Sequence, residues 1–398
     1  MPIGARLVAV DEAEVVIEKL VAGGEGLARI EGVPVFVARS APGDRLRVRL
    51  TERHSDYGRA TIVEILQPGP GRRPDPFPEL SATGLCDLQH LDDALQVRLR
   101  AEAVQETLAR LGRIELPERI EVLSGQPWGY RLRTQLHAAP DPVTGAMRVG
   151  YHARGTNDLV AVDRCALLVP ELDALLAELP ARLAGSPARR LDLAAGDGAE
   201  ITVAPLLPGL PHGEVSMVVG GLSYAFDARC FFQVHRQLLP RLVELAVGPW
   251  EGGEAFDLYS GVGLFSLALA GRYRRVVGVE ADRVAARYAR NNARRNRLQR
   301  VEGVAQVAES WIAALPDRPD RVLVDPPRAG LASKVRQALA ARAARRLTYV
   351  SCDAATLARD LRFLNAAYRI ESIHLLDLFP QTGHMEAIVQ LLARDSVA

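Results

Sequence analysis

The stretch Glu254–Ala270, EAFDLYSGVGLFSLALA, decides the fold, because it reads as a buried strand, a glycine-rich turn and an apolar helix in immediate succession. Gly261 and Gly263 allow the backbone to turn sharply and to approach a ligand closely. From about Phe226 onward, strands alternate with amphipathic helices, which is the pattern of a parallel α/β sheet. The sequence therefore predicts a Rossmann-like α/β domain over residues 226–398.

The next strand of this domain supplies a candidate ligand-binding carboxylate. RRVVGVEADRV (residues 274–284) carries Glu280 at the strand end, about 20 residues beyond the glycine turn, where an acidic side chain accepts hydrogen bonds from ribose hydroxyls. A dinucleotide fold would have the fuller pattern Gly-x-Gly-x-x-Gly, which this turn lacks. Asp257 ahead of the glycines fits S-adenosylmethionine, so the turn favours this cofactor over a dinucleotide.

A third apolar strand ends in Asp325, within DRVLVDPPRAGL (residues 320–331). Ligands of open α/β sheets bind at the carboxyl ends of strands, so we expect Asp325 where cofactor and substrate meet. The two prolines after it lack backbone donors and have a fixed φ, which makes a rigid wall. Enzymes that methylate adenine nitrogen usually have an aromatic residue next, and here Arg328 stands in that place.

A lone cysteine stands at a strand-to-helix corner in TYVSCDAATLARDL (residues 348–361). Cys352 ends the strand at the rim of the same crevice, and a helical pattern begins at once. Because a helix N-terminus stabilises a thiolate and lowers the pKa of the thiol, we expect a nucleophile. The alternative is a small buried hydrophobe, the usual role of a lone cysteine, and the position beside a cofactor-type turn favours the nucleophile.

Glu386 is the candidate general base. In LLDLFPQTGHMEAIVQLL (residues 375–392) it follows a loop and precedes an apolar strand. A carboxylate at a strand entrance facing the crevice can accept a proton from a substrate. The alternative is an exposed loop glutamate, which the spacing alone does not exclude.

The composition is that of a soluble protein in a reducing compartment. The 398 residues are 48% hydrophobic and 24% charged, and no apolar segment approaches the roughly 18 residues that span a bilayer. Four widely spaced cysteines make no disulfide framework, and acidic residues near the N-terminus argue against a secretory signal. We expect a cytoplasmic protein. The net charge of +1 says nothing about partners. The excess of arginine over lysine suits phosphate binding, but it also follows from a GC-rich genome.

Residues 14–66 read as short alternating strands separated by glycine turns, which is typical of a small five-stranded β-barrel. Arg45, Arg47 and Arg49 share one strand face, which is either a phosphate-binding face or a solvated outer face. Residues 67–78, rich in proline and glycine, read as a linker.

Together these motifs resemble the S-adenosylmethionine-dependent RNA uridine-C5 methyltransferase family over nearly the full chain. The family's order and spacing are kept by DLYSGVGLFSL, VDPPRAGL, YVSCDAATLARDL and DLFPQTGHMEAIVQL, of which the last three are highly specific. LCDLQHL, GYRLRTQL and CFFQVH match as well. The N-terminal barrel resembles the TRAM domain that many members use to hold RNA.

The resemblance implies a class I methyltransferase with three domains: an RNA-binding, OB-like TRAM barrel at residues 1–72, a mixed α+β RNA-binding domain at 73–225, and the catalytic domain at 226–398. Within the central domain, residues 92–126 are expected to pack on the catalytic domain. We expect a monomer, because a barrel on a linker needs no partner subunit to grip a substrate.

The resemblance also implies the chemistry, which is methylation at C5 of a uridine in structured RNA. Cys352 matches the nucleophile that adds to C6, and Glu386 matches the base that removes the C5 proton. The positions that contact S-adenosylmethionine correspond to Gln233, Tyr259, Gly261, Glu280 and Asp325. Ribosomal RNA is favoured over transfer RNA, because the TRAM-like module resembles that of ribosomal-RNA-directed members.

Three departures from the family pattern are visible. Many members hold an iron–sulfur cluster on four cysteines, and this chain keeps Cys86 and Cys165 but has Phe77 and Thr83 at the other two positions, so we expect no cluster. Asp353-Ala354 replaces the usual Asn-Pro after the nucleophile, and a carboxylate there should oppose thiolate formation. Val307 stands where an acidic residue near the adenine is often found.

An arginine stripe follows Glu280, with Arg283, Arg287, Arg290, Arg294 and Arg297 at alternating spacings of four and three residues on one predicted helix. It is either a solvated face or an RNA-facing surface. Two other functions also remain open: a non-catalytic RNA-binding or folding factor with a relic pocket, and a methyltransferase acting on another base or a small molecule.

Overall fold

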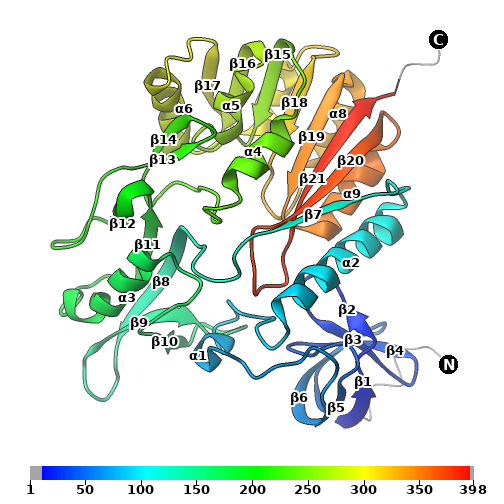
Figure 1. Cartoon of the computed structure of the whole chain (residues 1–398), viewed down its shortest axis with the longest axis vertical. Helices are drawn as coiled ribbons and strands as arrows, with labels where there is room; N and C mark the ends of the chain where they lie inside the picture. Colours follow the sequence, from blue (N-terminus) through cyan, green and yellow to red (C-terminus); the bar gives the residue numbers. More distant parts are fainter. Residues whose placement is uncertain (1–10, 395–398) are drawn as a thin grey trace. The chain divides into compact units, whose positions relative to one another are not determined.

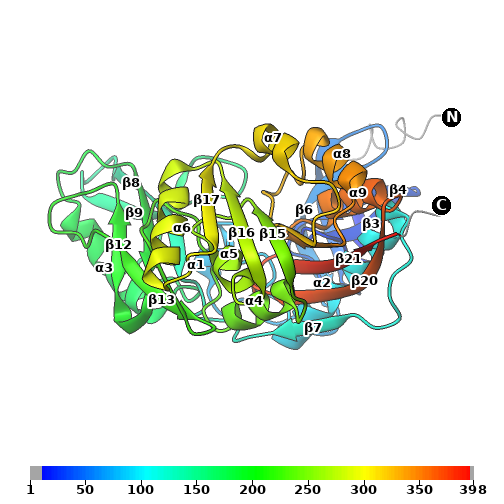
Figure 2. The same ribbon diagram turned by 90° about the horizontal axis from the view of Figure 1, so that it is seen from above.

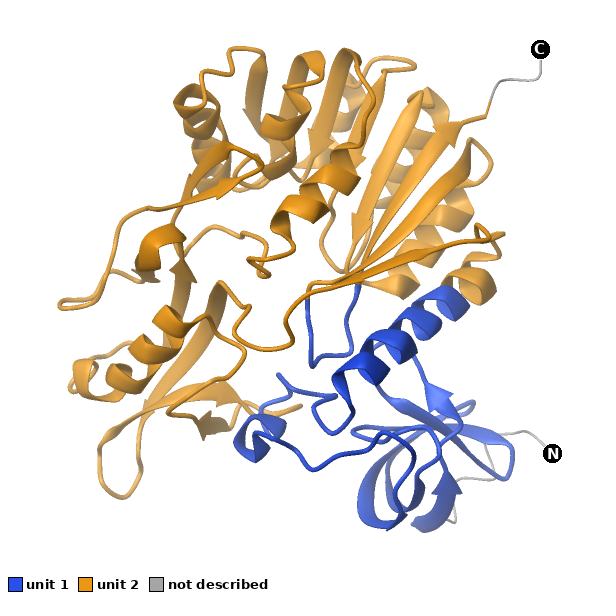
Figure 3. Cartoon of the chain, viewed as in Figure 1, with its two compact units in different colours: residues 1–107, 379–385 blue, residues 108–378, 386–398 orange. Residues whose placement is uncertain are grey.

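The chain, described over residues 11–394 in a computed structural model, forms two compact units (Figure 3). Unit 1 comprises residues 1–107 and 379–385, and unit 2 comprises residues 108–378 and 386–398. The division into two units does not test the three predicted domains, which therefore stay a prediction.

Unit 1 is built on one six-stranded sheet in the order β1-β5-β6-β4-β3-β2, in which only β4 and β6 pair in parallel. Its strands are β1 (Glu12–Val16), β2 (Lys19–Leu20), β3 (Gly26–Ile30), β4 (Val33–Val37), β5 (Arg45–Arg53) and β6 (Gly58–Gln67). Alternate side chains such as Val35, Leu46 and Val48 are buried in an aliphatic core. The sequence predicted five strands, and the sixth is β2, whose two residues pair with β3.

The arginine face of β5 is neutralised by carboxylates. The three arginines that we expected to share a face form the ion pairs Arg45–Glu14 (3.0 Å), Arg47–Glu64 (2.6 Å) and Arg49–Glu12 (2.7 Å). Their charges are offset within the unit, which favours the interpretation of this face as a solvated outer surface.

A late segment of the chain, Phe379–Met385, belongs to unit 1. The unit also contains α1 (Pro78–Ser81) and the first part of α2 (Asp93–Gly112). Gln96 of α2 donates from Nε2 to Gln381 Oε1 at 2.8 Å. Gly383 lies so close to the turn at Gly23 that a Cβ on it would stand 2.1 Å from the Gly23 carbonyl oxygen. The late segment is therefore anchored at two points within unit 1.

Unit 2 contains a five-stranded antiparallel sheet in the order β10-β9-β8-β11-β12, together with a separate hairpin of β13 and β14 (Figure 1). The elements are β8 (Arg133–Pro140), β9 (Met147–His152), β10 (Leu159–Ala161), α3 (Pro170–Arg182), β11 (Arg190–Ala195), η2 (Asp197–Ala199), β12 (Ile201–Ala204), β13 (Val215–Val219) and β14 (Leu222–Phe226). The two segments that the sequence marked as β-like are YRLRTQLHAA, which covers β8 except for its last residue, and MRVGYHARG, which contains β9.

The sheet that positions the candidate site has eight strands in the order β17-β16-β15-β18-β19-β21-β20-β7. They are β7 (Glu121–Ser124), β15 (Gly252–Leu258), β16 (Tyr273–Glu280), β17 (Val301–Ala305), β18 (Arg321–Val324), β19 (Arg346–Ser351), β20 (Tyr368–Asp377) and β21 (Glu386–Ala393). The first five strands in this order are parallel, and β21 runs antiparallel to β19. The predicted parallel α/β sheet is confirmed.

Helices cover both faces of this sheet, which is why β18 is buried along its whole length. On one face lie α4 (Leu239–Val247), α5 (Leu264–Leu269) and α6 (Arg283–Arg295), and on the other lie α7 (Ala308–Trp311), the short η3 (Ile312–Ala314), α8 (Ser333–Arg342) and α9 (Ala354–Leu364) (Figure 2). The carboxyl ends of the parallel strands consequently meet at one edge, where ligands of such sheets bind.

Candidate active site

Cys352 and Glu386 lie on neighbouring strands at this edge. β19 pairs antiparallel with β21 so that Ser351, the residue before Cys352, stands opposite Ala387, the residue after Glu386. The negative charge of Glu386 also acts on the Cys352 thiol. The structure therefore brings the predicted nucleophile and the predicted base together, with Glu386 only 2% exposed.

The thiol of Cys352 is a weak acid in this setting. Burial and then the negative charge of Glu386 raise its pKa to about 12, and the cation of Arg328 opposes them. We expected the N-terminus of α9 to lower this pKa, and for the protein without ligands that expectation is wrong, because desolvation and the charge of Glu386 raise it. Asp353 caps α9 by accepting from Thr356 N–H at 2.8 Å.

Arg328 is a further candidate functional residue, and the sequence motifs assigned it no role. Its guanidinium lowers the pKa of both Cys352 and Glu386, so its charge acts on both groups. The sequence signal was present, because an arginine follows the diproline where adenine-specific enzymes carry an aromatic residue.

Asp325 directly follows β18, and Gln233 donates from Nε2 to its Oδ2 at 3.2 Å. Burial raises the pKa of Asp325 to about 7. The pKa of Glu386 is raised well above its ordinary value by burial and then by the charge of Asp325. Carboxyl groups that disfavour each other's ionisation are stabilised by a nearby cation. This arrangement suits a positively charged ligand such as the sulfonium of S-adenosylmethionine.

The glycine-rich turn after β15 has the polar groups that such a ligand needs. Asp257 is fully buried and accepts from the Ser266 hydroxyl, while its Oδ1 and Ser260 Oγ have no hydrogen-bond partner within residues 11–394. Nothing lies within 4 Å of the place that a Cβ on Gly261 would take, and its N–H donates to Glu280 Oε2 at 2.8 Å. Unpartnered buried atoms around an open turn fit S-adenosylmethionine.

Tyr259 has a left-handed backbone, with φ of 66°, which is strained for a residue with a side chain. Its ring lines a cavity of about 400 Å³ together with Glu309 and Pro327. Burial and the charge of Glu309 raise the pKa of Tyr259. Glu309 was not singled out from the sequence. It supplies an acidic side chain in the first turn of α7, two residues after Val307, which is 46% exposed.

The cysteines of the first half do not fit an iron–sulfur cluster. Cys86 and Cys165 are both buried. Phe77 offers no ligand atom, and the Thr83 hydroxyl donates to Leu80 O at 2.6 Å. Within the described residues no group of three or more His, Cys, Asp or Glu side chains has the arrangement of a metal site.

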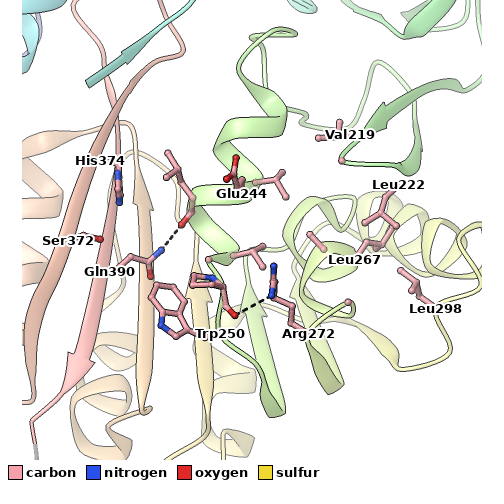
Figure 4. A pocket seen from close by; sticks show the side chains of 18 residues that line it. Val219, Leu222, Glu244, Trp250, Leu267, Arg272, Leu298, Ser372, His374 and Gln390 are labelled. Carbon is pink, nitrogen blue, oxygen red and sulfur yellow. Dashed lines mark hydrogen bonds between the residues drawn. The ribbon is translucent and has the colours of Figure 1, made fainter. Parts of the chain in front are cut away.

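Size alone does not identify the site. A cavity of about 650 Å³ lies along α4 and α5, and its lining includes Trp250, Arg272 and His374 but none of the predicted site residues (Figure 4). Across residues 11–394, no helix is both long enough and apolar enough for a membrane crossing.

Known proteins resemble both halves of the chain. The family described as tRNA (Uracil-5-)-methyltransferase matches residues 217–394, and the TRAM domain family matches residues 9–63. The 23S rRNA (uracil(1939)-C(5))-methyltransferase RlmD of Pectobacterium atrosepticum is 33% identical over 93% of this chain and 91% of its own length. The enzyme of the same name from Cronobacter sakazakii is 34% identical over 96% of both chains.

A solved structure agrees with these relatives. The tRNA (uracil-54, C5)-methyltransferase of Pyrococcus abyssi, crystallised with S-adenosyl-L-homocysteine, superposes with a TM-score of 0.75 and 25% identity. The similarity covers 96% of this chain and 100% of that one.

Proposed function

The chain belongs to the family of S-adenosylmethionine-dependent RNA uracil-C5 methyltransferases, and on this basis we propose a covalent mechanism carried by Cys352 and Glu386. The observation that supports it is the pairing of β19 with β21, which brings Cys352 and Glu386 to one edge of the sheet, where the charge of Glu386 acts on Cys352 and the charge of Asp325 acts on Glu386.

Cys352 activates the substrate in this mechanism. Uracil C5 is a poor nucleophile, and addition of the Cys352 thiolate to C6 turns the ring into an enolate that is nucleophilic at C5. The methyl group that joins C5 comes from S-adenosylmethionine. Glu386 then takes the proton from C5, the bond between Sγ and C6 breaks with its electron pair returning to sulfur, and the C5–C6 double bond is restored.

The charges in the site act on Cys352 as the nucleophile and on Glu386 as the base. The charge of Arg328 favours the thiolate form of Cys352. Burial and the charge of Asp325 raise the pKa of Glu386, which makes its ionised form a stronger base, and the charge of Arg328 favours that ionised form. The uridine has to leave its base stack to reach both groups, and loops or bulges of RNA lower the cost of that step.

We assign 23S ribosomal RNA as the substrate, with transfer RNA as the second candidate. The relatives with 33–34% identity over more than nine-tenths of both chains act on 23S rRNA, whereas the tRNA enzyme of known structure is 25% identical. Analysis of nucleosides in both RNA pools of a deletion strain tests this choice. Loss of 5-methyluridine from transfer RNA alone contradicts it.

The covalent step is tested with 23S rRNA that contains 5-fluorouridine. Fluorine does not leave C5 as a proton does, so the adduct between RNA and Cys352 persists through denaturing electrophoresis. We expect the shifted band with the wild-type protein and S-adenosylmethionine, and its loss in Cys352→Ser. On unmodified RNA, Glu386→Gln should accumulate the adduct, because elimination needs the base. No adduct with the wild type contradicts the mechanism and leaves RNA binding without catalysis.

A further inference from the structure

The arginine stripe forms a basic surface on α6. Arg283, Arg287, Arg290 and Arg294 lie on the helix, which ends at Arg295, so the prediction that the helix also carries Arg297 is wrong. Arg297 follows the C-cap with a φ of 58°. It nevertheless lines the same cavity as Arg290 and Arg294, with a volume of about 580 Å³.

The charges of these five arginines are not offset by the protein. Within residues 11–394, none of them forms an ion pair with a carboxylate, whereas Arg295 on the same helix pairs with Glu214 at 2.7 Å. Arg290 and Arg294 reach only neutral groups, the carbonyl oxygen of Gly303 at 3.4 Å and Asn291 Oδ1 at 3.3 Å. The stripe is thus an unneutralised cationic face in a chain whose other surface arginines are largely paired.

The shape of the face suits an extended anion. α6 lies beside β17, the edge strand of the large sheet (Figure 2). Gly303 of β17 makes room for the Arg290 stem, since a Cβ there would stand 2.7 Å from Arg290 Cγ. From Arg283 to Arg294 the helix rises about 16 Å, which is too long for one phosphate and matches on the order of three to five phosphates of one strand.

We propose that this face, defined as Arg283, Arg287, Arg290, Arg294 and Arg297, binds the phosphate backbone of the substrate RNA outside the target nucleotide. The inference rests on the proposed function, because the RNA it binds is the one that is methylated. Guanidinium groups suit phosphate oxygens, and such contacts add affinity without reading sequence.

The test is the salt dependence of binding to unmodified 23S rRNA transcribed in vitro. The variant carries Arg287→Gln, Arg290→Gln and Arg294→Gln. Arg283 is kept because it directly follows Asp282 at the start of the helix, near Glu280. Three fewer phosphate contacts should reduce the slope of log K against log salt by about 2 and weaken binding on the order of tenfold at about 0.1 M salt.

Two matched variants control for charge and for folding. The first replaces the same three arginines by lysine, which keeps the charge and should keep the slope. The second carries Arg272→Gln, Arg275→Gln and Arg295→Gln, an equal loss of charge at arginines paired with Glu251, Glu254 and Glu214. It should also keep the slope. All variants should bind S-adenosylhomocysteine as the wild type does.

An unchanged slope in the variant with Arg287→Gln, Arg290→Gln and Arg294→Gln overturns the inference and leaves an acidic protein as the partner to seek. An equal fall of the slope in the paired-arginine variant overturns it as well. Failure of the proposed function has a different signature. In that case the wild type forms no adduct with 5-fluorouridine RNA, whatever the salt slopes of the variants.

Discussion

At the scale of single residues, the sulfur of the proposed nucleophile is protonated in the protein alone. The pKa of Cys352 is raised to about 12, so a charge that enters with the ligands has to favour the thiolate. The sulfonium of S-adenosylmethionine is such a charge, and S-adenosylhomocysteine lacks it. We therefore expect iodoacetamide to alkylate Cys352 faster when S-adenosylmethionine is present, by about tenfold for each pKa unit that the cation removes.

The measurement follows modification of Cys352 by mass spectrometry at about pH 8, where a thiol of raised pKa is almost wholly protonated. S-adenosylhomocysteine is the matched ligand without the sulfonium charge, and Cys352→Ser reports any reaction of the three buried cysteines. Equal acceleration by the two ligands would contradict an electrostatic cause.

Asp257 makes the stability of the ligand-free protein depend on pH. Burial raises its pKa from 3.8 to about 7, so the folded chain holds this proton more tightly than the unfolded chain. Its contribution to stability is present below about pH 4 and is lost as the pH rises through 7. Asp257→Asn cannot ionise. It should therefore be more stable than the wild type by on the order of 4 kcal/mol at about pH 8, and by only about 1–2 kcal/mol at about pH 5, where the folded carboxyl is still protonated.

Thermal unfolding without cofactor at the two pH values provides the measurement. Ser333→Ala on the exposed start of α8 is a control that should show no pH-dependent gain. A gain of equal size at both pH values would show that the effect does not come from ionisation.

The proximity of Cys352 and Glu386, whose roles stay a prediction, was predictable because strand ends and motif spacing are visible in the sequence. The pKa of the thiol was not, because the opposing carboxylate comes from β21 and enters only through the pairing with β19. A helix N-terminus, read from the sequence alone, gave the wrong sign.

At the scale of elements, α9 carries the departure from the family pattern. Asp353 accepts from Thr356 N–H, so its carboxylate satisfies the helix N-terminus. We expect Asp353→Ala to destabilise the protein by about 1 kcal/mol, whereas Asp353→Asn should keep the cap and remove the charge. Denaturant unfolding gives the stability difference.

The same pair of variants decides whether the carboxylate slows catalysis. If Asp353 opposes the thiolate of Cys352, methyl transfer in Asp353→Asn should be faster than in the wild type at equal stability. An equal rate of methyl transfer would mean that the charge of Asp353 has no effect on Cys352, whose pKa is raised mainly by burial and by Glu386.

Element types were more predictable than element partners. The alternation of strands and helices after Phe226 correctly predicted the parallel sheet. The pairing of β7 with β20 could not be predicted, because the hydrophobic pattern of a short strand does not indicate which distant strand it pairs with. The end of α6 was placed two residues too late, since arginine spacing alone carries no stop signal.

At the scale of the whole molecule, the chain leaves unit 2 after Leu378, contributes Phe379–Met385 to unit 1, and returns to unit 2 with Glu386. The sequence shows this segment only as a loop, because membership of a unit depends on contacts with residues hundreds of positions earlier, such as Gln96. The proposed base thus follows directly on a segment anchored in unit 1, and we predict that its placement depends on that anchoring.

Gly383→Ala tests this dependence. A Cβ at Gly383 would stand 2.1 Å from Gly23 O and 2.6 Å from Gly24 N, which are backbone atoms that cannot rotate away. The segment has to shift, and Glu386 three residues later shifts with it. We expect removal of the C5 proton to slow more than addition of Cys352, so that a covalent adduct with ordinary 23S rRNA accumulates and turnover falls on the order of tenfold or more.

A milder variant and a control separate placement from folding. Gln96→Ala removes the hydrogen bond to Gln381 without a clash, and it should produce the same adduct in smaller amount. Gly271→Ala, whose Cβ would meet only Ala268 O at 3.4 Å, should behave as the wild type. If Glu386 is misplaced, Cys352 should still add to the uracil, but its elimination from the methylated base should be blocked. Lower turnover without any adduct in both Gly383→Ala and Gln96→Ala would therefore mean that the segment supports the fold and does not position Glu386.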